Sequence, residues 1–369
     1  LGGGQLGRYA LMAAATMGYR TVVVDPDPSA PAGTVASEHL VTPYDDPTSL
    51  RRLVSDCDVV TVEFENPPAA ALDELSVGTV VAPSPDAVRI AQDRILEKRF
   101  LVENGFPVGP YAELVSGAGS PAVEMRPDPV FEGSAVVKAT RLGYDGKGQR
   151  RVDGVAEVHA AHADLGGVPC VVEQLLDLQT ELSVLVARTV DARAETWVVA
   201  ENRHVDGVLD LSVVPADVAP QLTDRASGLG MAIADALGFV GVLAIELFVV
   251  DGELLVNELA PRPHNSGHWT LDASVTSQFE QQIRAVCGLG LGDTAMTAPA
   301  IAMVNLLGDR WSAGEPDWDV VLDEPHAKLH LYGKHEARPG RKMGHLTVVS
   351  DVTSAAAATA LHLRDRLTP

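Results

Sequence analysis

The sequence predicts a mixed α/β and α+β protein of three consecutive domains, at about residues 1–88, 89–296 and 297–369. Strands and helices alternate in the first part, which is typical of a parallel, doubly wound sheet. The middle part contains segments with the apolar–polar alternation of antiparallel strands. The last part is β-rich and small, and ends in one helix. At roughly 100–200 residues per domain, 369 residues allow two to four domains.

A glycine-rich turn opens the first domain, which we expect to be Rossmann-like. Gly2 to Gly7 fits GxGxxG and precedes a helix over residues 8–17, and Asp25 follows a short strand. Such glycines let a backbone approach a phosphate at a helix N-terminus. Three interpretations stay open: a dinucleotide site with Asp25 at the ribose, a mononucleotide-phosphate or substrate site, and a plain tight turn. The strand that should precede Gly2 is missing, so we expect the chain to begin inside a longer sequence.

One helix is expected to lead into the second domain. Ser84 is suited to cap it and Pro85 to occupy its first position, and the pattern runs to about Asn104, where Gly105 ends it. Beyond it, we expect a lid subdomain at about residues 112–176.

Lys138 lies in an otherwise apolar strand, directly before a second glycine-rich loop at residues 143–148. A lysine in that setting needs an anion or a carboxylate partner. A flexible glycine loop that closes over phosphates would supply one. The alternative is a surface lysine and an ordinary hairpin turn. GxxxxGK[ST] is absent from the sequence, so this is not a Walker A loop.

Two glutamates are expected on one face of a hairpin around Asp251-Gly252. A three-residue turn would place Glu246 opposite Val256, so that Glu246 and Glu258 become diagonal neighbours. Two carboxylates so placed repel each other unless a cation joins them, and Mg²⁺ suits two carboxylates together with nucleotide phosphates. The alternative is a pair of solvated strand acids.

A polar segment, residues 260–268, follows Glu258. Arg262, His264 and Asn265 can all donate to an oxyanion, which indicates a site loop. His264 and His268 could instead bind zinc, but no third ligand is evident. A merely structural loop is the remaining alternative.

Composition excludes several partners. The net charge of −22 argues against nucleic acid and anionic membranes, which need a basic surface. Small phosphorylated ligands need only local cationic clusters, and the sequence has two: Lys138, Arg141, Lys147, Arg150 and Arg151; and Lys334, Arg338, Arg341 and Lys342. The three cysteines are far apart, which favours reduced core thiols. No apolar run is long enough to span a bilayer and no signal peptide opens the chain, so a cytoplasmic location is expected.

Together these motifs resemble the ATP-grasp superfamily. The resemblance rests on Lys138, the Gly-Tyr-Asp-Gly-Lys-Gly loop, Glu173-Gln174-Leu175-Leu176, Glu246 and Asn257-Glu258. Within the superfamily, the strings GGGQLGR, FEN, GYDGKGQ, NELAPRPHNSGHW and RPGRKMGHL are similar to the N5-carboxyaminoimidazole ribonucleotide synthetase family, from residue 2 to about residue 350. The resemblance implies an ATP-grasp fold between a Rossmann-like domain and a small C-terminal domain.

The resemblance also implies a carbon–nitrogen ligase of purine biosynthesis. The γ-phosphoryl group of ATP would activate bicarbonate as carboxyphosphate, and the exocyclic amine of 5-aminoimidazole ribonucleotide would capture that intermediate or the carbon dioxide it releases. The products would be N5-carboxyaminoimidazole ribonucleotide, ADP and phosphate. Mg²⁺, with Mn²⁺ as a substitute, and a homodimer are further implications.

The residue roles that the resemblance implies fall into four sets. ATP would contact Arg94, Lys138, the lid Gly143, Tyr144, Asp145, Gly146, Lys147 and Gly148, the adenine strand Glu173, Gln174, Leu175 and Leu176, the ribose ligand Glu181, and His204. The metal would be held by Glu246 and Glu258, with Asn257 beside them. Bicarbonate and carboxyphosphate would contact Arg262, His264 and Asn265, with Asp145 also catalytic. The ribonucleotide would contact Gln5, Leu6, Glu63, Tyr144 and Asp145, and its 5′-phosphate Lys334 and Arg341.

Three alternatives to this function remain. Another ATP-grasp ligase with a different acyl substrate, such as formate, is the nearest. A nicotinamide-dependent oxidoreductase would use the Gly2–Gly7 turn and Asp25, but leaves Lys138 and the paired glutamates unexplained. A non-catalytic ATP-binding subunit would be expected to lack a metal ligand or the oxyanion loop.

Overall fold

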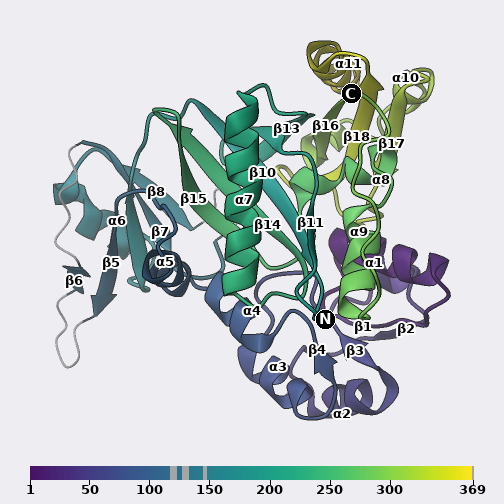
Figure 1. Cartoon of the computed structure of the whole chain (residues 1–369), viewed down its shortest axis with the longest axis horizontal. Helices are drawn as coiled ribbons and strands as arrows, with labels where there is room; N and C mark the ends of the chain where they lie inside the picture. Colours follow the sequence, from purple (N-terminus) through teal and green to yellow (C-terminus); the bar gives the residue numbers. More distant parts are fainter. Residues whose placement is uncertain (117–122, 127–132, 144–147, 368–369) are drawn as a thin grey trace.

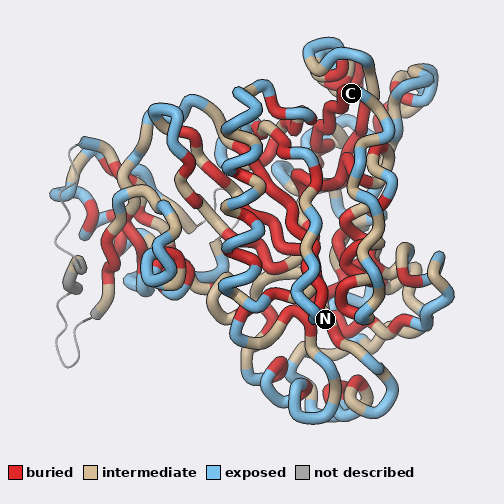
Figure 2. The backbone as a smooth tube through the Cα atoms, in the orientation of Figure 1, coloured by how far each residue is buried: buried red, intermediate tan, exposed pale blue. Residues whose placement is uncertain are grey.

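The computed structural model describes residues 1–116, 123–126, 133–143 and 148–367. Figure 1 shows a large central sheet with the long helix α7 (Pro220–Ala236) lying across it. A smaller sheet lies at one end of the molecule, the N-terminal helices lie below, and the C-terminal strands continue the central sheet at the opposite end (Figure 1). Figure 2 shows that the buried backbone is concentrated along the central strands.

The N-terminal region contains two parallel strand pairs instead of the single sheet that the alternation predicts. β1 (Val22–Val24) pairs with β2 (Glu38–Leu40), and β3 (Val59–Val60) pairs with β4 (Val80–Val81). The backbone at Leu1 and Gly2 joins the pairs, because Gly2 N–H donates to Val24 C=O at 3.0 Å and Glu63 N–H donates to Leu1 C=O at 3.0 Å. The surrounding helices are α1 (Gln5–Thr16), η1 (Pro31–Thr34), α2 (Pro47–Asp56), α3 (Ala69–Ser76) and α4 (Pro85–Ala91).

The predicted single helix from Ser84 to Asn104 is wrong, because the helix breaks at Gln92 and Asp93. Asp93 caps a second helix, α5 (Arg94–Glu103), by accepting from Ile95 N–H at 3.0 Å. Asp93 therefore begins a new helix, as N-cap aspartates do. The Gln92 side chain donates to the carbonyls of Glu65 and Pro67, both at 3.0 Å, and so holds the Phe-Glu-Asn segment against the break.

The expected lid region forms a separate antiparallel sheet in the order β6-β5-β9-β7-β8. Its strands are β5 (Tyr111–Ser116), β6 (Val123–Arg126), β7 (Ala135–Ala139), β8 (Gln149–Val152) and β9 (Cys170–Gln174). η2 (Val155–Glu157) and α6 (Val158–Asp164) complete it, and α6 adds Val158 and Ala161 to its core.

The large sheet crosses the predicted boundary between the second and third domains. Its described order is β15-β14-β10-β12-β13-β16-β18-β17, and β11 adds to β10. Antiparallel pairing of β13 with β16 is the junction. The strands are β10 (Thr180–Arg188), β11 (Ala194–Thr196), β12 (Ala200–Val205), β13 (Val208–Val214), β14 (Gly241–Val250), β15 (Glu253–Ala260), β16 (Ala300–Leu307), β17 (Ala327–Leu331) and β18 (Lys342–Ser350). The remaining helices are η3 (Asn265–Gly267), α8 (Thr270–Ala273), α9 (Gln278–Val286), η4 (Gly308–Trp311), α10 (Asp319–Leu322) and α11 (Thr353–Arg366).

The β14–β15 hairpin differs from its predicted register in two ways. Asp251 and Gly252 form a two-residue turn with φ of 50° and 77°, so Val250 pairs with Glu253. Positive φ at both positions matches the right-handed twist of the strands. A bulge then occurs beside Asn257, because Leu247 pairs with Val256 but Glu246 pairs with Glu258. The two glutamates are therefore directly opposite each other, not diagonal.

Among the helices that the structure describes, none combines the length and apolar character needed to cross a membrane.

Ile233 tests the packing of α7 on the large sheet. Its side chain is fully buried in one core with Val184 and Ile245. Ile233→Ala leaves a cavity, so we expect the free energy of unfolding to fall by about 2–5 kcal/mol in a urea titration. Met231→Ala, on the same helix but 41% exposed, should stay within about 0.5 kcal/mol of wild type. Equal losses in the two variants would contradict this packing.

Candidate active site

A cleft of about 960 Å³ brings together residues from every part of the chain. The predicted site residues that line it are Gln5, Leu6, Glu63, Arg94, Lys138, Glu181, His204, Glu246, Asn257, Glu258, Arg262, His264, Asn265, Lys334 and Arg341. Six further predicted site residues are described by the structure but are not part of the cleft wall: Gly143, Gly148, Glu173, Gln174, Leu175 and Leu176. Tyr144, Asp145, Gly146 and Lys147 lie outside the described residues.

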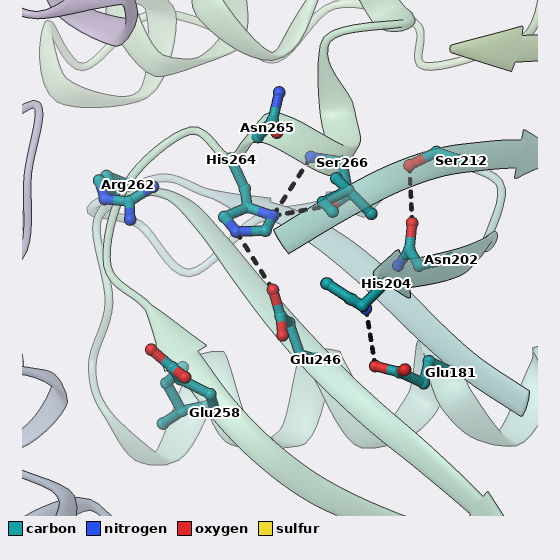
Figure 3. Close-up of polar contacts among 12 residues, drawn as sticks. Glu181, Asn202, His204, Ser212, Glu246, Glu258, Arg262, His264, Asn265 and Ser266 are labelled. Atoms are coloured by element: carbon teal, nitrogen blue, oxygen red, sulfur yellow. Dashed lines mark hydrogen bonds and ion pairs between the residues drawn. The ribbon is translucent and has the colours of Figure 1, made fainter. Parts of the chain in front are cut away.

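The carboxylates of Glu246 and Glu258 project into this cleft from adjacent strands (Figure 3). Burial and the charge of Glu258 raise the pKa of Glu246. The negative charge of Glu258 thus opposes ionisation of Glu246, as a neighbouring acid does. The neighbouring Asn257 Oδ1 is buried and has no hydrogen-bond partner among the described residues. These oxygens form a donor set suited to a hard divalent cation.

Lys98 stabilises the bulge that creates this arrangement. Its ammonium group donates to the Asn257 carbonyl at 3.1 Å and lies 3.0 Å from Glu173 Oε1. Lys138 contacts the other oxygen of Glu173. Burial opposes ionisation, but Lys98 and then Lys138 hold the pKa of Glu173 far below its usual value. The anionic partner expected for Lys138 is therefore a carboxylate of the neighbouring strand β9.

His264 is positioned as a neutral hydrogen-bonding group. Burial and then the charge of Arg262 hold the pKa of His264 well below its usual value. Its Nδ1 accepts from Ser266 N–H at 3.3 Å and lies 2.9 Å from Ser266 Oγ, and its Nε2 lies 3.2 Å from Glu246 Oε1 (Figure 3). A backbone N–H only donates, so Nδ1 is the acceptor and Nε2 carries the hydrogen that faces Glu246.

Arg262 and Arg94 supply permanent positive charge around the carboxylates. Arg262 Nε lies 2.6 Å from Glu65 Oε2, and Arg94 Nη2 lies 3.0 Å from Glu258 Oε2. Burial works against ionisation of Glu65, but the charge of Arg262 lowers its pKa. Glu65 therefore orients Arg262 as a charged partner.

The glycine turn is filled by side chains of the protein itself. Glu63 accepts from Gly4 N–H at 2.8 Å and from Gly7 N–H at 2.9 Å. Asp25 accepts from Gly3 N–H and from the Tyr44 hydroxyl, both at 2.7 Å. The backbone donors that a dinucleotide pyrophosphate would use are thus committed to Glu63, and Asp25 is committed within the fold. The arrangement does not favour the dinucleotide interpretation.

The second basic cluster reaches the same cleft through a turn at Pro339 and Gly340, where Gly340 has φ of 72°. Lys334 Nζ donates to the Lys342 carbonyl at 2.7 Å, and Arg341 Nη1 donates to the Glu336 carbonyl at 2.9 Å. These contacts hold both side chains at the cleft, and the expected role at a phosphate stays a prediction.

A second group of possible metal ligands, Asp272, His330 and His345, lies outside the cleft. The rings of His330 and His345 stack at 4.4 Å with an interplanar angle of 8°. The lone pairs of a ring nitrogen lie in the ring plane, so two stacked rings hold their lone pairs in parallel planes, which does not favour convergence on one ion. His330 Nε2 instead lies 2.9 Å from Asp272 Oδ2.

Sequence reasoning missed several residues that organise the site. No individual role was predicted for five of them: Glu65, Gln92, Lys98, Gln278 and Arg338. Glu65 does lie in the quoted Phe-Glu-Asn string, and Arg338 lies in the second basic cluster. Lys98 and Glu65 act through partners far away in the sequence, and neither interrupts an apolar strand as Lys138 does. Their positions carry no local signal that would have indicated the contacts.

Three family models match the chain in consecutive order. The ribonucleotide synthetase preATP-grasp domain matches residues 1–92, and the ATP-grasp domain matches residues 99–279. The phosphoribosylaminoimidazole carboxylase C-terminal domain matches residues 301–359.

Whole-chain relatives agree with these matches. The N5-carboxyaminoimidazole ribonucleotide synthase of Brucella melitensis is 42% identical over 362 residues, which cover 96% of this chain and 96% of the relative. A solved N5-carboxyaminoimidazole ribonucleotide synthetase from Thermus thermophilus is 37% identical with a TM-score of 0.88, covering 100% of this chain and 97% of the other. The Aspergillus clavatus synthase, solved with ADP and 5-aminoimidazole ribonucleotide, is 28% identical with a TM-score of 0.87 and covers 100% and 97%.

The Glu181–His204 pair generates a pH-dependent prediction. His204 Nδ1 lies 2.9 Å from Glu181 Oε2. Burial opposes the charged imidazole, but the hydrogen bond to Glu181 and the charge of Glu246 raise the pKa of His204. A raised folded pKa stabilises the protein below the unfolded value of about 6.5, and this stabilisation is lost as the pH rises through the folded pKa.

We therefore expect Glu181→Gln to lower the free energy of unfolding more at about pH 5.5 than at about pH 9. Denaturant titrations of both proteins at the two pH values measure the difference. Glu324→Gln, in the exposed pair with His326, is the control and should show no such pH dependence. A loss of stability that is the same at both pH values would contradict the assigned pairing.

Proposed function

The chain belongs to the N5-carboxyaminoimidazole ribonucleotide synthase family, and on this basis we propose that it carboxylates 5-aminoimidazole ribonucleotide with bicarbonate and ATP. An oxygen of bicarbonate attacks the γ-phosphorus, the bond to ADP breaks, and carboxyphosphate forms. The exocyclic amine then attacks the carboxyl carbon, or carbon dioxide released from it. A carbon–nitrogen bond forms, phosphate leaves, and the amine loses a proton. The products are N5-carboxyaminoimidazole ribonucleotide, ADP and phosphate.

The observation that carries this proposal is the single cleft shared by the three parts of the chain. This cleft is lined by the paired carboxylates of the hairpin, by the polar loop after Glu258 and by the basic turn near Arg341. A ligase that joins two substrates at the expense of a third needs such a common space, because the reacting atoms must be held together.

Mg²⁺, or Mn²⁺ in its place, fits the donor set at the hairpin. Glu246 and Glu258 would hold the ion, with the Asn257 Oδ1, which has no partner among the described residues, beside them. A bound divalent ion neutralises charge on transferring phosphoryl oxygens. Arg94 lies against Glu258, and this supports assigning it to the same phosphates.

The loop after Glu258 is suited to bicarbonate and carboxyphosphate. Arg262 stays charged beside Glu65, and His264 stays neutral with its Nε2–H as a donor. A charged donor and a neutral donor side by side favour an oxyanion without placing two positive charges next to each other. Asn265 would complete this set, and Asp145, proposed to act with it, lies outside the described residues.

The remaining cleft residues divide between the two nucleotides. Among the cleft residues, we assign ATP to Arg94, Lys138, Glu181 and His204. We also assign the adenine to Glu173 to Leu176 and the lid to Gly143 to Gly148, although residues 173–176 are not part of the cleft wall and residues 144–147 lie outside the described residues. We assign the imidazole ribonucleotide to Gln5, Leu6, Glu63, Lys334 and Arg341, with Tyr144 outside the described residues. A homodimer and a cytoplasmic location remain proposals based on the family.

The first test of the function is ADP formation in the presence and absence of each co-substrate. ADP release should require both 5-aminoimidazole ribonucleotide and bicarbonate. Release supported by formate in place of bicarbonate would instead favour a sister ligase, and nicotinamide-dependent hydride transfer would favour the oxidoreductase alternative.

Removing either paired carboxylate should abolish most of the activity. Glu246→Gln and Glu258→Gln each delete one charged ligand of an ion that stabilises transferring phosphoryl charge, which should raise the barrier by several kcal/mol, or at least about 100-fold in kcat. Steady-state ADP release measures this. Glu253→Gln, in the same hairpin but exposed beside Arg225, should behave as wild type. Wild-type turnover in both site variants would refute the metal assignment.

Arg341→Ala should weaken the binding of 5-aminoimidazole ribonucleotide and leave the binding of ATP almost unchanged. Loss of one charge-assisted contact costs roughly 1.5–3 kcal/mol, or about 10- to 100-fold in the KM for 5-aminoimidazole ribonucleotide. Varying each substrate at saturating levels of the others separates the two constants. Arg366→Ala, at the exposed end of α11, is the control. If both KM values stay at the wild-type level, the basic turn is not the phosphate site.

A further inference from the structure

The backbone of His264 is paired by a side chain. Its N–H donates to Oε1 of Gln278 at 2.8 Å, and its C=O accepts from Nε2 of Gln278 at 2.7 Å. Gln278 is the first residue of α9 and is fully buried. A primary amide presents a donor and an acceptor side by side, as a peptide unit does. Gln278 therefore pairs with His264 as a neighbouring strand would.

The orientation of the Gln278 amide follows from its partners. A backbone N–H only donates and a backbone C=O only accepts, so each end of the amide has one possible identity. The second hydrogen on Nε2 faces Nδ1 of His268 at 3.2 Å. One side chain thus holds the backbone of one loop histidine and the ring of another.

The packing around this amide leaves little freedom for the loop. A Cβ added to Gly267 would lie 2.6 Å from Gln278 Oε1. The Gln278 backbone N–H donates to Thr270 Oγ1 at 3.0 Å, and that hydroxyl donates to the Gly267 carbonyl at 2.7 Å. These contacts close the loop on the C-terminal side of His264, and the Nε2 of its ring faces Glu246.

We propose that Gln278 is a positioning residue, which acts through the backbone of His264 to set the direction of that imidazole at the paired carboxylates. The proposal rests on the proposed function, in which His264 contacts the carboxylated intermediate. Gln278 itself is not part of the cleft wall. Its contribution to catalysis therefore passes through His264.

The same helix carries a matched control. Gln281 is also fully buried, accepts from Gly292 N–H at 2.9 Å and donates to the Gly292 carbonyl at 2.8 Å. This is the same two-bond clamp, but Gly292 is not part of the cleft wall. Equivalent substitutions at the two glutamines remove equivalent hydrogen bonds, and only one of them affects the loop that carries His264.

The kinetic test compares Gln278→Glu and Gln278→Leu with Gln281→Glu and Gln281→Leu in the full chain. Glutamate keeps the shape but loses both donors, and leucine loses the whole clamp. We expect kcat for ADP release to fall about 10- to 100-fold in the Gln278 variants, because small displacements of a reacting group cost that much. The Gln281 variants should retain kcat with a similar loss of unfolding free energy. Equal kcat in both pairs would overturn the proposal.

A double-variant cycle with His264→Ala decides whether the effect passes through His264. If Gln278 acts only by positioning that ring, Gln278→Leu should lower kcat little further once the imidazole is absent. A full additional loss of about 10- to 100-fold in the His264→Ala background would show that Gln278 acts independently, which also overturns the proposal.

A second readout does not depend on activity. In protein with ¹⁵N-labelled histidine, the ring signals of His264 are identified by their disappearance in His264→Gln. We expect them to indicate one neutral tautomer with hydrogen on Nε2, and to shift toward a tautomer average in Gln278→Glu and Gln278→Leu but not in the Gln281 variants. Unchanged signals in the Gln278 variants refute the positioning role. Absence of bicarbonate-dependent ADP release in the wild type refutes the proposed function alone.

Discussion

The direct opposition of Glu246 and Glu258 is the constraint around which the site is built. The two carboxylates lie on adjacent strands, and burial together with the charge of Glu258 raises the pKa of Glu246. Hydrogen-bond donors lie next to both carboxylates: Arg94 contacts Glu258, and the neutral His264 contacts Glu246. None of these contacts is a routine surface ion pair, because all four side chains line one cleft. Arg94 supplies part of the opposite charge that two neighbouring carboxylates require.

Maintaining that opposition requires support from outside the hairpin. The bulge beside Asn257 leaves a carbonyl that Lys98 satisfies, and Lys98 is itself held against Glu173. On the other side, Gln278 pairs with the backbone of His264. Helices α5 and α9 thus hold the strand end and the loop that follows it. A buried polar network of this kind is most useful when every member has its partner, since an unpartnered member would be costly.

The glycine turn of the N-terminal region binds a carboxylate of the protein, whereas its glycine pattern is typical of a phosphate site. The turn at Gly2–Gly7 provides backbone donors at a helix N-terminus, as a phosphate loop does, but Glu63 takes them. The turn therefore holds the carboxylate of Glu63 at the cleft. The same pattern of glycines can therefore serve a phosphate or an internal acid, and only the residue that arrives from another strand distinguishes them.

The sequence by itself determined much of the order of strands and helices and about half of the residues that line the cleft. The strands, the glycine turns and the paired glutamates follow from local patterns, such as apolar periodicity and polar residues that interrupt aliphatic runs. The resemblance to a known family, and no local pattern, indicated Arg94, Glu181 and His204. Tertiary structure decided the break at Asp93, the bulge beside Asn257, the carboxylate in the glycine turn and the glutamine behind His264. These features depend on partners that are distant in the sequence, such as Glu63 for the glycine turn and Lys98 for the bulge, or on the exact pairing of two strands. Local sequence carries no information about which distant group will arrive, so packing alone settles these contacts.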